Sequence, residues 1–321
     1  MNLLEIKNLK MDFGKNAEAQ RAIDDVSFTI GTGETVCLVG ESGCGKTVTA
    51  LSIARLVPSP PANYVGGEIL LDGQDVLKMP YGELRNIRGG VVSYIFQEPG
   101  AALNPVFRVG NQIMESLKLH RPEKATNEEV IRLLKLVGIP APESRIRNYP
   151  FEMSGGMQQR VMIAMALASE PKLLVADEPT TALDVTIQAQ ILDLLSDLKQ
   201  RLGMAILLIT HNLGIVGDMA DRVAVMYAGQ IVELAPAKEL LRRPLHPYTR
   251  ALMNAVPKLA GGANRLSAIP GNVPRIGNFP PGCRFYPRCP SAKPECADKM
   301  PALVELEPNR WVRCSYAKDL K

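Results

Sequence analysis

Apolar residues in the first 235 positions fall into the short runs that are typical of strands. Val26, Phe28 and Ile30 alternate with polar residues, which predicts a strand with one buried face. Continuous apolar runs predict strands covered on both faces, at 35–39, 173–176 and 205–209. Further strands are predicted at 68–71 and 91–96, and a hairpin is predicted over 222–234.

Helical spacing occurs between these strands. The apolar residues of 127–137 share one helical face, and Gly138 follows at the place where a helix would end. Ser154 and Asp184 have the side chains of helix N-caps, which predicts helices that run to about residue 168 and to just before Gly203. Buried strands that alternate with helices form a mostly parallel sheet with helices on its faces. The expected fold class is α/β, with a small antiparallel sheet made by the early strands.

Charge and proline content both change near residue 235. Residues 1–234 hold 22 Lys and Arg against 27 Asp and Glu, whereas residues 235–321 hold 15 against 6, together with 13 of the 25 prolines. Such a shift is typical of a module boundary. We therefore expect a main domain over 1–234 and a C-terminal extension over 235–321.

Composition limits the class of protein. The chain is 46% hydrophobic and 22% charged, which excludes disordered and fibrous proteins. No apolar run is long enough to span a membrane, and no signal-peptide pattern occurs at the N-terminus. We expect a protein that stays in the cytoplasm. The cations of the extension are spread among prolines rather than along one helix, which argues against nucleic acid as a partner.

A glycine-rich segment at 40–47 has the sequence Gly-Glu-Ser-Gly-Cys-Gly-Lys-Thr. It fits the pattern of a phosphate-binding loop, and it lies between a buried strand and a helical stretch, as that loop requires. We call residues 40–47 the phosphate loop. Its backbone N–H groups would surround phosphate groups, its lysine would reach the outer phosphates and its threonine would bind Mg²⁺. The residues expected at the nucleotide are Gly40, Ser42, Gly43, Cys44, Gly45, Lys46 and Thr47.

Two adjacent carboxylates end the buried strand at 173–176. Asp177 is expected on the Mg²⁺ side, because neighbouring carboxylates beside phosphates need a metal ion to offset their charge. Glu178 would then orient or deprotonate the attacking water.

In this order the motifs resemble those of the nucleotide-binding subunits of ATP-binding cassette (ABC) transporters. The resemblance implies a cassette with a parallel core, an antiparallel subdomain and a helical subdomain at about 98–168, and two subunits that enclose ATP head to tail. Met153 stands where the family's signature commonly has Leu, and Cys44 where its phosphate loop commonly has Ser. Phe13 would stack on adenine or lie in the core. The other residues assigned by resemblance are Gln97 (Q-loop, near Mg²⁺ and water), Ser154, Gly155 and Gly156 (signature), Asp184 (D-loop, 181–184) and His211 (γ-phosphate).

The extension resembles one branch of that family, the oligopeptide, dipeptide and nickel importer subunits. The segments His-Pro-Tyr at 246–248 and Ile-Pro-Gly-Asn-Val-Pro at 269–274 carry this resemblance, followed by Cys283, Cys289, Cys296 and Cys314. Four thiolates suit zinc or an iron–sulfur cluster, and their spacing matches neither a zinc ribbon nor a bacterial ferredoxin. The branch resemblance implies a [4Fe–4S] cluster, with zinc as the next alternative and unligated thiols as the last. Arg284, Arg288, Arg313 and Lys293 would then offset its negative charge.

The expected protein is a peripheral ATPase on the cytoplasmic face of the membrane that drives import of di- or oligopeptides. Its expected partners are two membrane permease subunits, contacted near Gln97 and 99–105, and a paralogous ATP-binding subunit or a second copy. An extracytoplasmic solute-binding protein would act indirectly. The alternatives are an importer of nickel or another small solute, a soluble ABC ATPase acting on nucleic acid, and a metal-dependent regulatory or redox protein.

Overall fold

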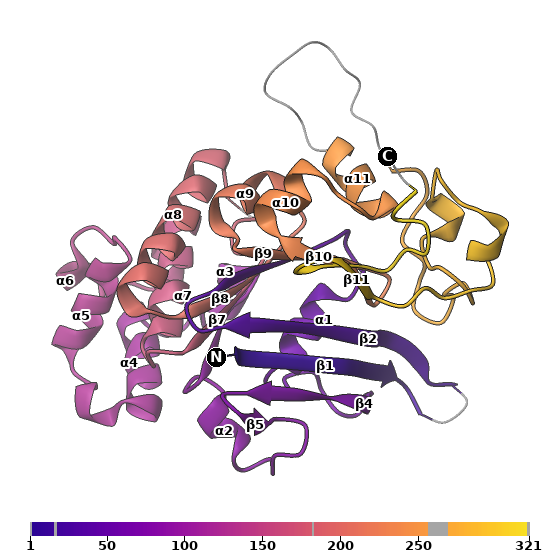
Figure 1. Ribbon diagram of the computed structural model, residues 1–321. Helices are drawn as coiled ribbons and strands as arrows, with labels where there is room; N and C mark the ends of the chain where they lie inside the picture. Colours follow the sequence, from indigo (N-terminus) through magenta and orange to yellow (C-terminus); the bar gives the residue numbers. More distant parts are fainter. Residues whose placement is uncertain (1, 16–17, 182, 256–268, 320–321) are drawn as a thin grey trace. The chain divides into compact units, whose positions relative to one another are not determined.

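The computed structural model describes residues 2–15, 18–181, 183–255 and 269–319 (Figure 1). The chain divides into two compact units, each described here by itself. The first unit comprises 31–34 and 79–208; the second comprises 2–30, 35–78 and the chain from 209 onward.

An antiparallel sheet in the second unit contains the earliest strands of the chain. Its strands run in the order β2-β1-β4-β5, and β1 pairs antiparallel with β4. Val26, Phe28 and Ile30 of β2 are buried, which confirms the half-buried strand predicted there. The strands of this sheet are β1 (Asn2–Phe13), β2 (Gln20–Gly31), β4 (Ala62–Leu71) and β5 (Gln74–Asp75).

The same unit contains a second group of strands, in the order β11-β12-β10-β9-β3. Strand β3 pairs parallel with β9, and β9, β10, β12 and β11 pair antiparallel with one another in turn. Ala228 and Gly229 both have positive φ angles at the turn of the predicted hairpin. The strands are β3 (Thr35–Val39), β9 (Arg222–Tyr227), β10 (Gln230–Pro236), β11 (Val304–Glu307) and β12 (Arg310–Val312).

The residue at which we placed the module boundary lies inside β10, and two strands of the extension continue the sheet from β10 (Figure 1). The extension and the strands of the main domain therefore share one hydrogen-bonded network in this unit. The helices of the second unit are α1 (Lys46–Ser52), α9 (Val216–Met219), α10 (Ala237–Arg242) and α11 (Pro247–Ala255).

The first unit contains the remaining parallel strands and most of the helices. Strands β6 and β7 are parallel, and β8 follows β7 in the order β8-β7-β6, with its last two residues in the second unit. The strands are β6 (Val92–Ile95), β7 (Leu173–Asp177) and β8 (Ala205–Thr210). The helices are α2 (Leu84–Ile87), α3 (Pro99–Ala102), α4 (Val109–His120), α5 (Asn127–Leu136), α6 (Pro142–Arg145), α7 (Gly155–Leu167) and α8 (Val185–Leu202).

Both predicted helix caps are present in this unit. The Ser154 side chain accepts a hydrogen bond from the backbone of Met157, and the Asp184 side chain accepts one from Ile187. Helix α8 ends at Gly203, whose φ of 67° is the left-handed conformation that terminates helices. In the described residues, no helix is both long and apolar enough to cross a membrane. The architecture is the α/β fold predicted from the sequence.

Candidate functional site

The phosphate loop lies in the second unit, between β3 and α1. At Gly40 a Cβ atom would lie 2.2 Å from the Met226 carbonyl oxygen, so only glycine lets β9 pass this close. Gly45 has a φ of 108°, which side-chain-bearing residues rarely adopt. The loop therefore depends on glycine for its path along the end of the strand.

The Lys46 ammonium group lies inside this loop. Its Nζ donates to the carbonyl oxygens of Gly40, at 2.8 Å, and Glu41, at 3.1 Å. Ser42, Gly43 and Thr47 are exposed, as groups that bind a ligand must be. The Cys44 side chain is buried and burial raises the pKa of its thiol, while its carbonyl oxygen accepts a hydrogen bond from Gly229. Cys44 thus contributes backbone geometry to the loop rather than a reactive thiol.

In the first unit, Gln97 and Glu178 lie together at the carboxyl ends of neighbouring parallel strands. Ile95 of β6 is opposite Ala176 of β7, so the residues that follow both strands emerge side by side. Gln97 Nε2 donates to Glu178 Oε2 over 3.3 Å. The Thr181 hydroxyl donates to the same oxygen over 2.9 Å.

Glu178 also has an unusual backbone. Its φ is +46°, in the left-handed region that is costly for residues other than glycine. The preceding residue, Asp177, is buried at the end of β7. Such strain in a carboxylate residue at a strand end is a feature of functional sites, where the surrounding fold holds a side chain in a required direction.

The signature residues begin α7 next to the start of α8. A Cβ on Gly156 would lie 3.0 Å from Ile187 Cγ2, so the two helix starts are in close contact. Ser154 and Gly155 are exposed. Asp184 begins α8, whereas Ala182 of the predicted D-loop lies outside the described residues. The first unit therefore presents the exposed start of α7 beside the residue that caps α8.

Two predicted nucleotide contacts lie in the second unit. Phe13 ends β1 opposite Ala62 and is half-buried. His211 follows β8 directly and is exposed. Both side chains are accessible to a ligand, and their roles stay predictions.

Three of the buried arginines of the extension are each adjacent in sequence to one of the four cysteines. Arg284 follows Cys283, Arg288 precedes Cys289 and Arg313 precedes Cys314. Sequence reasoning expected these arginines to offset the charge of a cluster. In the structure their guanidinium groups bind carboxylates of the 1–234 segment, and Arg288 and Arg313 also bind carbonyl oxygens of the extension. Compensation of a cluster's charge stays a prediction. Lys293 lies 3.8 Å from Asp319 and stacks on Tyr316, within the extension.

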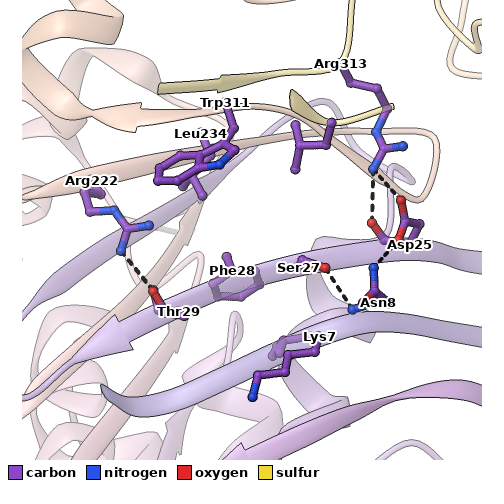
Figure 2. Close-up of a pocket in the computed structure, with 12 residues that line it drawn as sticks. Lys7, Asn8, Asp25, Ser27, Phe28, Thr29, Arg222, Leu234, Trp311 and Arg313 are labelled. Atoms are coloured by element: carbon purple, nitrogen blue, oxygen red, sulfur yellow. Dashed lines mark hydrogen bonds and ion pairs between the residues drawn. The ribbon is translucent and has the colours of Figure 1, made fainter. Parts of the chain in front are cut away.

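Arg313 and Arg284 bind neighbouring residues of β2. Arg313 donates to Asp25 Oδ2 over 3.0 Å, at one end of a cavity of about 360 Å³ that Trp311 helps to line (Figure 2). Arg284 donates to Asp24 Oδ2 over 2.6 Å and also to the Ala228 carbonyl oxygen. These contacts join the extension to both the antiparallel sheet and the β9–β10 turn.

The four cysteines of the extension lie within electrostatic range of one another. Burial raises the pKa of the Cys283 thiol to about 11, and the negative charges of the other three add to the shift. Cys283, Cys296 and Cys314 line a cavity of about 230 Å³. Within the ranges that the structure describes, however, no group of three or more His, Cys, Asp or Glu side chains could hold a metal ion. Three of the thiols thus line one cavity, but the described residues around them form no group of ligands that could hold a metal ion.

The predicted His-Pro-Tyr segment lies at the start of α11 and is anchored by Glu233 of β10. The fully buried carboxylate of Glu233 accepts hydrogen bonds from the backbone of Leu245, at 2.9 Å, and His246, at 2.8 Å. The Nδ1 atom of His246 accepts a hydrogen bond from the Tyr248 backbone, which requires an unprotonated nitrogen.

Burial lowers the pKa of His246 from 6.5 to about 3. Below pH 6.5 the unfolded chain therefore takes up a proton at His246, whereas the folded chain does not. The stability that neutral His246 contributes to the fold is thus lost as the pH falls. We expect the unfolding free energy to drop by about 2 kcal/mol from this group between pH 7 and pH 5. Urea unfolding of the wild type and of His246→Asn at both pH values measures it.

The comparison with His246→Asn isolates this effect from other groups. Burial raises the pKa of Glu233, so its contribution to stability changes with pH in the opposite direction. An equal pH dependence in the wild type and the variant would show that His246 is not the responsible group.

Comparison with known proteins agrees with this geometry. The family described as "ABC transporter" matches residues 23–181, and "Oligopeptide/dipeptide transporter, C-terminal region" matches residues 232–296. A probable peptide ABC transporter ATP-binding protein of Sinorhizobium fredii is 50% identical over 97% of this chain and 94% of its own. The oligopeptide transport ATP-binding protein AppD of Bacillus subtilis is 50% identical, over 97% and 96%. The dipeptide transport ATP-binding protein DppD of Escherichia coli is 47% identical, over 99% and 98%.

Solved structures show the same cassette. A dimeric ATP-binding cassette in a post-hydrolysis state, bound to ADP and phosphate, aligns with a TM-score of 0.64 and 26% identity over 73% of this chain and 98% of that one. The protein cbiO1 of Clostridium perfringens, part of the ABC transporter complex cbiONQ, aligns with a TM-score of 0.65 and 25% identity over 75% of this chain and 91% of that one.

The fold and the site thus define an ATP-hydrolysing cassette of the α/β class. The chain belongs to the ATP-binding subunits of ABC transporters, in the oligopeptide and dipeptide branch. Both resemblances predicted from the sequence are confirmed.

Proposed function

We propose that this chain hydrolyses ATP to drive the import of di- or oligopeptides through a membrane transporter. The observation that carries the proposal is the similarity to peptide transport ATP-binding proteins across nearly the whole chain, extension included. The predicted nickel specificity remains the alternative within the same branch, and an action on nucleic acid has no further support.

The chemistry is an attack of water on the γ-phosphate. Lys46 would bind the outer phosphates and His211 would hydrogen-bond the γ-phosphate, while Glu178 would orient the water. Mg²⁺, bound through oxygen donors such as those of Thr47, Gln97 and Asp177, would neutralise phosphate charge. The contacts of Gln97 and Thr181 with one oxygen of Glu178 support a fixed orientation for that carboxylate.

An exposed apolar surface in the first unit supports a permease contact near Gln97. Phe96 is 44% exposed, Val106 71% and Phe107 53%, just before and just after the predicted contact segment. Phe151, 70% exposed, stacks on Tyr149, whose ring lies near Arg108. Large exposed apolar side chains in one segment favour a protein-binding surface. Two permease subunits would bind here, which would hold the chain at the cytoplasmic face of the membrane.

The ATP sandwich requires a second cassette. The exposed start of α7 and the phosphate loop would belong to different ATP molecules, since each supplies its own anion site. The dimeric solved relative supports this arrangement. We propose a paralogous subunit as the partner, or a second copy of this chain, with a solute-binding protein delivering peptide to the permeases outside.

The four cysteines fit the thiolate set of an iron–sulfur cluster. Their number supports this proposal, as does the placement of Cys283, Cys296 and Cys314 around one cavity, and zinc stays the alternative. A [4Fe–4S] cluster bound by Cys283, Cys289, Cys296 and Cys314 would supply a covalent link between distant parts of the extension.

Uptake by the reconstituted transporter tests the function. We expect the complex of this chain with its permeases, partner subunit and solute-binding protein to import labelled dipeptide only when ATP is inside the vesicles with the cassettes. Lys46→Ala should abolish uptake. Import of nickel but not of peptide would show that the proposed substrate class is wrong. ATPase activity stimulated only by nucleic acid would refute the proposed transport function.

Anaerobic purification tests the cluster. We expect about four irons and four sulfides per chain and a brown protein, and a Cys289→Ser variant with less iron. One zinc per chain without iron would establish the alternative, and a chain without metal would refute both.

A further inference from the structure

The phosphate loop contains a carboxylate, at Glu41, directly after its first glycine. A negative charge beside a bound triphosphate opposes binding unless a cation compensates it. Arg288 supplies that cation from 247 positions further along the chain: Nη1 lies 2.8 Å from Glu41 Oε2, and Nη2 lies 2.9 Å from Oε1. This bidentate pairing orients the carboxylate and also compensates its charge.

Arg288 is itself held in place by residues of the extension and of β9. Its side chain is only 5% exposed. Its Nε donates to the Pro270 carbonyl oxygen over 2.8 Å, and its Nη1 also donates to the Tyr227 hydroxyl over 3.3 Å. Arg288 therefore ties the phosphate loop to the extension through Pro270 and to β9 through Tyr227.

A second contact fixes the backbone of the same residue. The Glu41 backbone N–H donates to the hydroxyl of Tyr248 over 2.9 Å. Tyr248 is fully buried, and its ring packs against Tyr227 at 4.6 Å and Phe285 at 5.3 Å between centroids. Both the side chain and the backbone of Glu41 are thus held by residues of the extension.

We propose that Arg288 and Tyr248 are positioning residues for the phosphate loop, through which the extension sets the affinity for ATP. This rests on the proposed role of the loop in binding ATP, which Lys46→Ala tests separately. Neither residue touches the reacting atoms. Both act on the nucleotide through Glu41, so they govern binding and leave the hydrolytic residues of the first unit unchanged.

The proposal predicts a charge-dependent loss of affinity. Arg288→Ala leaves the Glu41 carboxylate unpaired in the loop, and we expect the Kd for ATP and the KM to rise roughly tenfold to a hundredfold. The kcat should stay within about twofold, because the step after binding is untouched. The loss should be greater for ATP than for ADP, since ATP carries more negative charge. Tyr248→Phe, which removes a single hydroxyl, should raise KM by only a few-fold.

Rescue separates this role from a general loss of folding. We expect Arg288→Ala combined with Glu41→Gln to recover most of the ATP affinity, because the unpaired charge is gone. Arg288→Lys should have an intermediate affinity for ATP, since lysine keeps the positive charge but cannot donate two parallel hydrogen bonds to the Glu41 carboxylate. Arg310→Ala is the matched control: Arg310 is also buried, but it pairs with Glu307, the Arg243 carbonyl oxygen and, at 4.0 Å, Glu233, and none of these partners belongs to the phosphate loop.

The experiment measures displacement of a fluorescent ATP analogue from the full chain, and kcat and KM in the assembled transporter, with Trp311 fluorescence as the check on folding. Recovery in the double variant together with near-normal binding in Arg310→Ala supports the proposal. Wild-type affinity in Arg288→Ala, absence of rescue by Glu41→Gln, or an equal loss in Arg310→Ala would overturn it. If Lys46→Ala binds ATP normally, the proposed role of the loop in binding ATP is wrong. That result is distinct from the results above, which would contradict only the positioning role of Arg288 and Tyr248.

Discussion

Glu178→Gln is expected to bind ATP with near-normal affinity and to hydrolyse it at least about a hundredfold more slowly than the wild type. The amide keeps the shape of the side chain and its hydrogen bond with Thr181, so the strained backbone at this strand end is undisturbed. It loses the negative charge that would orient and activate water. Single-turnover hydrolysis in the assembled transporter, with nucleotide binding measured in parallel, checks this prediction.

Thr181→Ala is the matched control for this variant. It removes one hydrogen bond to Glu178 Oε2 while leaving the contact from Gln97 and the carboxylate in place. We expect a loss of only several-fold in turnover. If Glu178→Gln hydrolysed ATP at the wild-type rate in a complete transporter, another group would have to activate the water.

Glu233→Ala is expected to destabilise the second unit by about 3–5 kcal/mol. The carboxylate is fully buried and accepts two backbone hydrogen bonds, from Leu245 and His246. Alanine would leave both N–H groups without partners in the interior. Urea unfolding followed by the fluorescence of Trp311, the single tryptophan of the chain, measures the loss where β12 joins β10.

Glu307→Ala provides the comparison for this loss. Like Glu233, Glu307 has two partners, here the arginines Arg243 and Arg310, but its side chain is 38% exposed. Exposed ion pairs contribute little, and we expect a change of about 1 kcal/mol or less. Equal destabilisation by the two substitutions would mean that burial of the Glu233 hydrogen bonds is not what stabilises this part of the fold.

Local signals in the sequence predicted much of the cassette. The runs at 35–39 and 205–209 gave buried strands because their residues are apolar on both faces, and Ser154 and Asp184 cap helices as their side chains require. The two strand-end residues Gln97 and Glu178 come together for the simple reason that parallel strands end at one edge.

Several elements were missed, and in two of them polar residues interrupt the apolar pattern. In β1 the pairing with β4 shifts between Lys7 and Lys10, where Asn8 has a φ of 47°, and the alternation of buried positions is broken. In α4 the buried face includes Gln112, whose amide bonds to Asn104 and Phe107. A pattern of apolar residues alone does not identify such elements.

The arginines of the extension could be found in the sequence but not assigned from it. Their position beside cysteines suggested charge compensation for a cluster, whereas their partners Asp24, Asp25 and Glu41 are more than 240 positions away. Pairings over such separations are decided by how strands and turns pack, and no local spacing encodes them.

The pairing of Glu41 with Arg288 has a consequence for how the protein is made. Glu41 leaves the ribosome early, and translation must add 247 more residues before its partner exists, which takes about 12–50 s at ordinary bacterial or eukaryotic rates. During that time the nascent chain has a phosphate loop with an uncompensated carboxylate. A chain released before residue 288 therefore lacks the cation that pairs with Glu41. If Arg288 sets the ATP affinity as proposed, tight ATP binding would begin only after the extension has been translated.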